Sequence, residues 1–186
     1  MKKWIIIIAS VTTVLIVSLV VCLGLLNKEP DIEVKTSEYF EQITWDTSVT
    51  DAKFKLSSAG YQGLSDTIYS KSNFSGLDDA TVRVVISKGE DGQLDSFLLM
   101  FDSTSKKAGV SKSALVKLKK AYEKAFDKLT DKKVTRDIPG WDENIAWLTE
   151  NSCIDLLYTK DKKLTITYFR RGTEYSDLIE SLIEEK

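Results

Sequence analysis

The sequence predicts an α+β protein: an N-terminal transmembrane helix, then one domain of order α-βββ-α-βββ-α with a mostly antiparallel sheet. Three observations lead to this fold class. Residues 4–26 form one long uncharged apolar run; apolar residues recur every three or four positions in three later segments; and short apolar runs joined by polar turns lie between those segments. Strands joined by short hairpins pair antiparallel, and helices gathered on one face of such a sheet give an α+β layer fold.

The apolar run at the N-terminus is long enough for a membrane anchor. Residues 4–26 contain no charge and no proline, and a helix of this length extends roughly 34 Å, more than the ~30 Å hydrocarbon core of a bilayer. A cleavable signal has an apolar region of only about 7–15 residues; cleavage, and lipidation at Cys22, remain the alternatives. Lys2 and Lys3 are expected to keep the N-terminus in the cytoplasm.

The chain is therefore expected to lie in the cell membrane as a single-pass protein, with its C-terminal domain outside. Its predicted parts are a cytoplasmic tip (1–3), the transmembrane helix (4–26), a polar stalk (27–38) and an extracytoplasmic α+β domain (39–186).

The sequence of the first half of this domain predicts one helix and three strands. Apolar residues of segment 48–60 recur on one helical face, with Ser48 as the N-cap and Gly60 as the terminating left-handed residue. Strands are expected at 66–72, 80–88 and 93–101, and a tight hairpin signal, Gly-Glu-Asp-Gly, joins the last two.

The second half repeats this order and ends in a third helix. Segment 111–132 is the clearest helix, because its apolar residues form one stripe at spacings of three and four residues, with Ser111 as the N-cap. Strands are expected at 144–150, 152–160 and 163–171. Segment 173–186 predicts the closing helix, with Thr173 as its N-cap.

The composition excludes several kinds of chemistry. Histidine is absent from the chain, so histidine-based catalytic triads and dyads and the commonest zinc ligand are excluded. Cys153 is the one cysteine beyond the apolar run, and its apolar surroundings predict a buried, inert thiol. Setting aside Lys2, Lys3 and Lys28 from the 26 basic residues, and Glu29 from the 28 acidic ones, leaves a domain charge of −4, which argues against nucleic acid as a partner. No cofactor or metal motif is found.

The segments ITWDTSVTDAKFKLSSAGY, DGQLDSFLLMF, SCIDLLY and KLTITYF, with Trp141 between the second and third, carry a resemblance. Their order is similar to the tandem helix-plus-sheet architecture of β-lactamase inhibitory protein and to the small domain of SmpA/OmlA outer-membrane lipoproteins. The similarity covers most of residues 40–170 and lies in element order and hydrophobic positions. It implies a domain that binds other proteins rather than an enzyme. The N-terminal anchor departs from both families, and no binding residue of either maps onto this chain.

Seven residues are candidates for contact with a partner. Trp45 and Trp141 each stand beside aspartate, and on the last strand Tyr168 and Phe169 face opposite sides, with Phe169 expected at the surface. A basic stripe on the long helix consists of Lys117, Lys120, Lys124 and Lys128. An acidic partner or an anionic envelope polymer could bind this stripe. The alternative reading is structural: tryptophans that anchor the core and a solvated helix face.

The function expected from these observations is non-catalytic binding of another protein or an envelope component by a membrane-anchored extracytoplasmic domain. One alternative is a carboxylate-dependent hydrolase of cell-wall glycans, in which Asp46 or Asp142 approaches a second acidic residue within roughly 5–10 Å. Another is a sensor or immunity-type envelope protein that acts through a membrane partner. The identity of the partner and the oligomeric state stay open.

Overall fold

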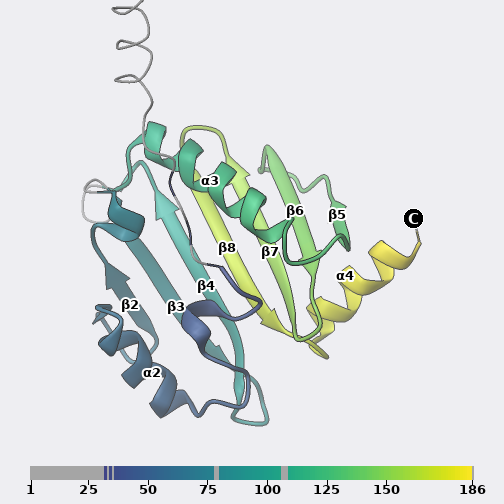
Figure 1. The fold of residues 1–186 in the computed structure, drawn as a ribbon, viewed down its shortest axis with the longest axis horizontal. Coiled ribbons are helices and arrows are strands. Elements are labelled where there is room, and N and C mark those ends of the chain that lie inside the picture. The colour runs from purple at the N-terminus through teal and green to yellow at the C-terminus, as the bar shows by residue number, and fades with distance from the viewer. Residues whose placement is uncertain (1–31, 33, 35, 78–79, 106–108, 186) are drawn as a thin grey trace, which may run out of the picture. The chain divides into compact units, whose positions relative to one another are not determined.

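A computed structural model describes residues 32, 34, 36–77, 80–105 and 109–185. Its centre is one sheet of eight strands in the order β1-β2-β3-β4-β8-β7-β6-β5 (Figure 1). All neighbouring strands pair antiparallel. The strands are β1 (Gln62–Gly63), β2 (Ile68–Lys71), β3 (Val82–Lys88), β4 (Leu94–Asp102), β5 (Lys133–Thr135), β6 (Glu143–Leu148), β7 (Ser152–Thr159) and β8 (Lys163–Arg170).

Three α-helices accompany the sheet in the described part of the chain: α2 (Val49–Ser58), α3 (Lys112–Phe126) and α4 (Glu174–Glu184). Each begins after the N-cap expected from the sequence. The side chains of Ser48, Ser111 and Thr173 accept hydrogen bonds from backbone N–H groups of the first helical turn. These bonds satisfy donors that have no partner inside the helix.

The expected number of strands was wrong. The domain consists of two halves, α2 followed by β1–β4 and α3 followed by β5–β8, and each half has four strands rather than three. The missed strands, β1 and β5, are the two outer strands of the sheet and are only two and three residues long. The last strands of the halves, β4 and β8, pair with each other at the centre, from Ser96 opposite Phe169 to Asp102 opposite Lys163.

The expected fold class also included a transmembrane helix, and this part needs correction as well. None of the helices in the described ranges is of sufficient length and apolar character for a membrane span. Residues 4–26, to which the transmembrane helix and signal-anchor were assigned, lie outside the described residues. Of the expected stalk, 27–38, Ile32 packs against the core and Val34 is buried.

The main core lies between the sheet and the layer formed by α2 and α3. Alternate residues of the strands point into it, including Val84 on β3, Phe97 on β4 and Ile166 on β8. Leu56 of α2 and Leu118 of α3 are fully buried against them.

Between the two helices, the short 3₁₀ turn η1 (Phe40–Gln42) covers the central strands (Figure 1). The Phe40 ring packs against Phe97 and Tyr168, with centroid distances of 5.6 and 5.9 Å. Glu41 and Gln42 both adopt positive φ, at 49° and 58°. Non-glycine residues rarely occupy this region, so the packing of Phe40 holds an unfavourable backbone in place.

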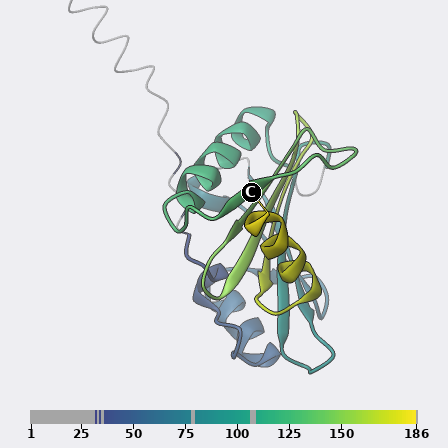
Figure 2. The ribbon, with the colours of Figure 1, turned by 90° about the vertical axis from the view of Figure 1, so that its right-hand side faces the viewer.

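Helix α4 lies on the opposite face of the sheet from α2 and α3 (Figure 2). It packs on a second, smaller cluster of buried residues: Val134, Ala146, Leu148, Cys153 and Ile179. The expectation that all helices gather on one face was therefore wrong. Because α4 contacts strands of the second half, β5–β8, it covers only half of this face.

Candidate protein-binding face

The other half of that face is not covered by any helix that the structure describes. We call it the open face. Its residues alternate with core residues along the strands and are all half-buried: Ile68, Ser70, Arg83, Val85, Leu98, Met100, Leu157 and Thr165. Two rows across the sheet define it. The first row runs across three strands and consists of Ile68, Val85 and Leu98. The second row runs across four strands and consists of Arg83, Met100, Thr165 and Leu157.

The centre of the open face is apolar, with Val85, Leu98 and Met100 on neighbouring strands. Five neighbouring strands, from β2 to β7, contribute to it, so it extends roughly 19 Å across the strands at a spacing of about 4.8 Å. A contiguous apolar area on one side of a sheet is a feature of interaction sites in soluble proteins. Side chains on a sheet are also held firmly by their neighbours, so little conformational entropy is lost when a partner covers them.

Charged groups border one end of the open face. Asp102 lies opposite Lys163 at the end of the β4–β8 pair. Burial alone would raise the pKa of Asp102, but hydrogen bonds from Thr104 and the positive charges of Lys163 and Arg83 outweigh it, so this pKa lies below its usual value. The border therefore carries charges of both signs, and a partner can be oriented there by complementary charges.

The opposite border is formed by α4 and a buried polar cluster beneath it. Asp155 on β7 is 3 % exposed. Its carboxylate accepts hydrogen bonds from Arg136 at 2.8 Å, Asn144 at 2.9 Å and Tyr175 of α4 at 2.7 Å. Arg136 also bonds the Tyr175 hydroxyl at 2.6 Å. This polar cluster fastens the start of α4 to the sheet and so fixes where the open face ends.

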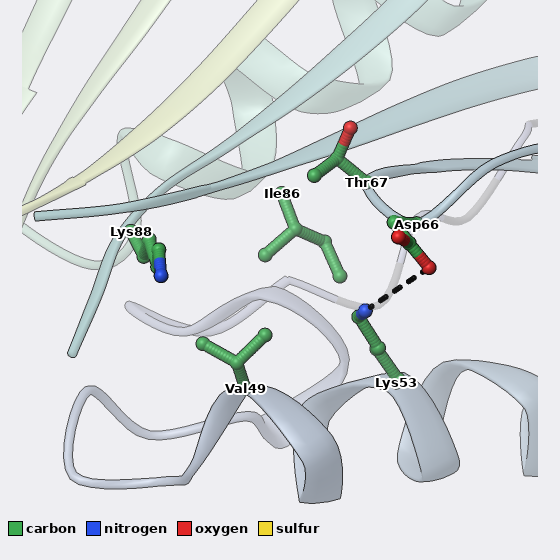
Figure 3. A pocket seen from close by; sticks show the side chains of 6 residues that line it. All are labelled: Val49, Lys53, Asp66, Thr67, Ile86 and Lys88. Carbon is green, nitrogen blue, oxygen red and sulfur yellow. Dashed lines mark ion pairs between the residues drawn. The ribbon is translucent and has the colours of Figure 1, made fainter. Parts of the chain in front are cut away.

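One hollow of about 310 Å³ lies at the far end of the first half, between α2 and the sheet (Figure 3). Ile86 and Val49 provide apolar surface, and Thr67 and Lys88 complete the lining. Lys53 and Asp66, which also line it, form an ion pair at 3.9 Å.

The candidate residues Trp45 and Phe169 occupy different faces of the sheet. Trp45 belongs to the main core: it is 8 % exposed, and its indole N–H donates to Ser152 at 3.0 Å. Phe169 is half-buried, and its ring stacks on Tyr175 of α4 at a centroid distance of 4.3 Å. Tyr168 is 2 % exposed and lies in the main core, so Tyr168 and Phe169 do face opposite sides of the strand.

The remaining candidates lie near the surface. Trp141 is half-buried in the turn before β6, where its backbone N–H donates to Ile138. Lys120, Lys124 and Lys128 are exposed, and Lys117 is half-buried. The neighbouring Lys119 forms two ion pairs. It pairs with Glu123 at 3.1 Å and with Glu143 at 2.5 Å.

The two aspartates singled out for a hydrolase lie near opposite ends of β7. Asp46 follows Trp45, whose ring bonds Ser152 at the start of that strand. Asp142 instead accepts a hydrogen bond from the backbone of Lys160, just past the strand's end, at 2.6 Å. Eight residues of strand extend roughly 25 Å. The two carboxylates are therefore too far apart to act together on one glycosidic bond.

Cys153 is fully buried under α4. Burial, together with the negative charge of Asp155, raises the pKa of its thiol to about 12, so the thiolate that reacts or binds metal is disfavoured. Within the described ranges, no three acidic or cysteine side chains gather closely enough to hold a metal ion.

The sequence contained a signal for the open face, but none of the candidate residues belongs to this face. Strands 80–88 and 93–101 are apolar on both sides, with Val85, Leu98 and Met100 alternating with core residues. An apolar second face indicates a covering layer or a partner, and the described part of the chain provides such a layer over the second half alone.

Comparison of the chain with protein-family models, with curated proteins and with solved structures gives no match. The resemblance to β-lactamase inhibitory protein and the SmpA/OmlA domain therefore stays a prediction.

Proposed function

We propose that this domain is a non-catalytic binding module for another protein and that the open face is its contact surface. The observation that carries the proposal is the uncovered apolar centre around Val85, Leu98 and Met100, next to a border with charges of both signs. Its location outside the cytoplasm stays a prediction from the N-terminal sequence, which lies outside the described residues.

The chemistry of the open face favours a protein over other envelope components. Sugars bind most often against exposed aromatic rings, and the open face has none. Anionic membrane surfaces are bound by clusters of lysine and arginine, whereas Arg83 and Lys163 are here accompanied by Asp102. An apolar patch with a mixed polar border is instead the usual anatomy of a protein interface. The sensor or immunity-type reading is compatible with such binding but has no separate support.

The experiment is site-specific photo-cross-linking with the full chain in its own cells. A photo-reactive residue at position 85, 98 or 100 should capture the same polypeptide in each case. The same residue at position 120, on the exposed side of α3, is the matched control and should not capture it. The polypeptide must then be purified and its affinity measured.

The affinity for the purified partner should fall at least tenfold in Leu98→Lys, because the substitution places a charge in the apolar centre. Unchanged affinity in this variant, or capture at position 120 in equal amount, would refute the assignment. Since Leu98 is half-buried, an unfolding curve must show that the variant is folded.

A further inference from the structure

The first row of the open face continues beneath α4. Beyond Leu98 on β4, the row crosses β8, β7, β6 and β5 with four more residues: Thr167, Asp155, Ala146 and Val134. These four are buried, whereas the three residues on the open face are half-buried. Helix α4 therefore covers one end of this row and leaves the other end to solvent.

The second row of the open face lies beside α4. The residues beneath the helix come from the first row and from the row on its far side, which consists of Phe169, Cys153 and Leu148. The second row, which continues beyond Leu157 as Asn144, lies on the near side. Neighbouring rows differ by two residues of a strand and are about 6.8 Å apart. The second row is therefore about 10 Å to the side of the axis of α4, a distance at which two helices pack together.

The contacts of α4 show which of its sides faces the second row. The hydroxyl of Tyr175 accepts a hydrogen bond from the guanidinium of Arg136, and the backbone N–H of Arg136 donates to the carbonyl of Asn144, which belongs to this row. Elsewhere on the helix, Glu180 pairs at 2.7 Å with Arg171, which follows the end of β8 and lies away from the second row. The side of α4 that carries Tyr175 is therefore the side towards the second row.

An uncovered leucine lies on that side. Successive residues of a helix are about 100° apart around its axis, so Leu178 is about 60° from Tyr175 and about 160° from Glu180. Leu178 is 51 % exposed. The open face thus has a floor formed by the sheet and, along one border, a wall formed by α4 with an apolar side chain on it.

The dimensions of the open face match one helix. It extends roughly 19 Å across the strands, and its two rows take up roughly 14 Å along them. A helix is about 10–12 Å wide with its side chains, and about 13 residues extend 19 Å. One helical turn rises about 5.4 Å, close to the strand spacing of about 4.8 Å, so successive turns can contact successive strands.

A second copy of this chain fits this place less well. A second sheet packs about 10 Å above the first, but α4 already occupies that layer next to the second row (Figure 2). The apolar sides of α2, α3 and α4 are buried in their own fold, so none of the described helices of another copy offers an apolar stripe.

We propose that the partner protein places an amphipathic helix over the second row of the open face, side by side with α4. Apolar residues at spacings of three and four along this helix contact Leu98 and Met100 on the floor and Leu178 on the wall. The inference rests on the proposed function and adds the kind of structural element that the open face binds.

The test begins with a photo-reactive residue at position 178 of the full chain in its own cells. It should capture the same polypeptide as positions 85, 98 and 100. The matched control is position 54 on α2, in the opposite layer, where Phe54 is 72 % exposed. Mass spectrometry of the cross-linked fragments then gives the contacting segment, and a synthetic peptide with the sequence of this segment is the probe for affinity.

The peptide should gain helical circular dichroism when it binds. Proline at a central position outside its apolar stripe should weaken binding at least tenfold, because proline interrupts a helix, whereas alanine at that position should have little effect. Leu178→Lys should weaken binding about fivefold or more, because it places a charge in the apolar contact. Phe54→Lys should bind the peptide as the wild type does. Both replaced residues are exposed, so folding is expected to be retained.

The outcomes separate this inference from the proposed function. Capture at positions 85, 98 and 100 without capture at 178, or equal binding of the proline peptide, would overturn the helix and leave the proposed function standing. If positions 85, 98 and 100 capture no common polypeptide, the proposed function itself is refuted and the helix with it. Capture of a second copy of this chain at position 178 would also overturn the inference.

Discussion

Replacing Asp155 by leucine should strongly destabilise the domain, because this carboxylate is the centre of the polar cluster beneath α4. Its side chain is 4 % exposed and that of Arg136 is 13 % exposed. Removing one partner of a buried ion pair costs about 3–5 kcal/mol, since the other charge is left without compensation. Asn144 and Tyr175 lose their hydrogen bonds in the same step.

The measurement is urea unfolding followed by circular dichroism. With a slope of about 2 kcal/mol per M, a loss of about 4 kcal/mol moves the midpoint by about 2 M. The slope itself should stay unchanged, because the surface exposed on unfolding is nearly the same.

A triple variant, Asp155→Leu with Arg136→Met and Tyr175→Phe, separates the cost of a broken cluster from the value of the cluster itself. Buried charges replaced together by apolar residues of similar size are often close to neutral in stability. The triple variant should therefore recover most of the loss. If Asp155→Leu costs less than about 1 kcal/mol, or if the triple variant is no more stable than the single one, then the cluster does not hold α4 by the contacts described.

Three further predictions concern Cys153, Asp127 and Ser111. Cys153 should resist iodoacetamide at pH 8 in the folded protein and react in urea, as its thiol pKa of about 12 implies; mass spectrometry gives the extent of labelling, and rapid labelling without urea would contradict its burial. Burial alone would raise the pKa of Asp127, but hydrogen bonds from Lys133 and Trp147 lower it. This carboxylate therefore stabilises the fold above its unfolded pKa of about 3.9 and loses that contribution as pH falls through the lowered folded value. Asp127→Asn should flatten this part of the stability-against-pH curve, and an unchanged curve would contradict the linkage. Ser111→Ala should cost about 1 kcal/mol in urea unfolding, because the N-cap of α3 is lost; a cost near zero would show that the cap bond at 3.1 Å does not stabilise the helix.

Local signals in the sequence located the helices well. An N-cap and the apolar stripe that follows it belong to one short segment, so Ser48, Ser111 and Thr173 could each be identified without knowledge of the rest of the fold. The longer strands could be found in the same way. The strands β1 and β5 could not, since two or three residues are too few to show alternation.

The position of α4 and the nature of the binding face depend on tertiary structure. An amphipathic pattern shows that one side of a helix is buried, but it does not show which face of the sheet it covers. This is why all helices were expected on one face. The same limitation applies to Trp45, for which the sequence left both a partner contact and a core position open; the core position depends on Ser152, a residue 107 positions away that accepts the hydrogen bond of the indole.

The pairing of β4 with β8 has a consequence for how the chain folds. Within each half, every strand pairs with its neighbour in sequence, whereas the union of the halves joins residues 94–102 to residues 163–170. To form this pairing, the chain must close a long loop and lose conformational entropy before the stabilising contacts exist. Contacts between residues so distant in sequence therefore slow folding. We expect substitutions along this seam to reduce the folding rate, and substitutions in the outer hairpins mainly to speed unfolding.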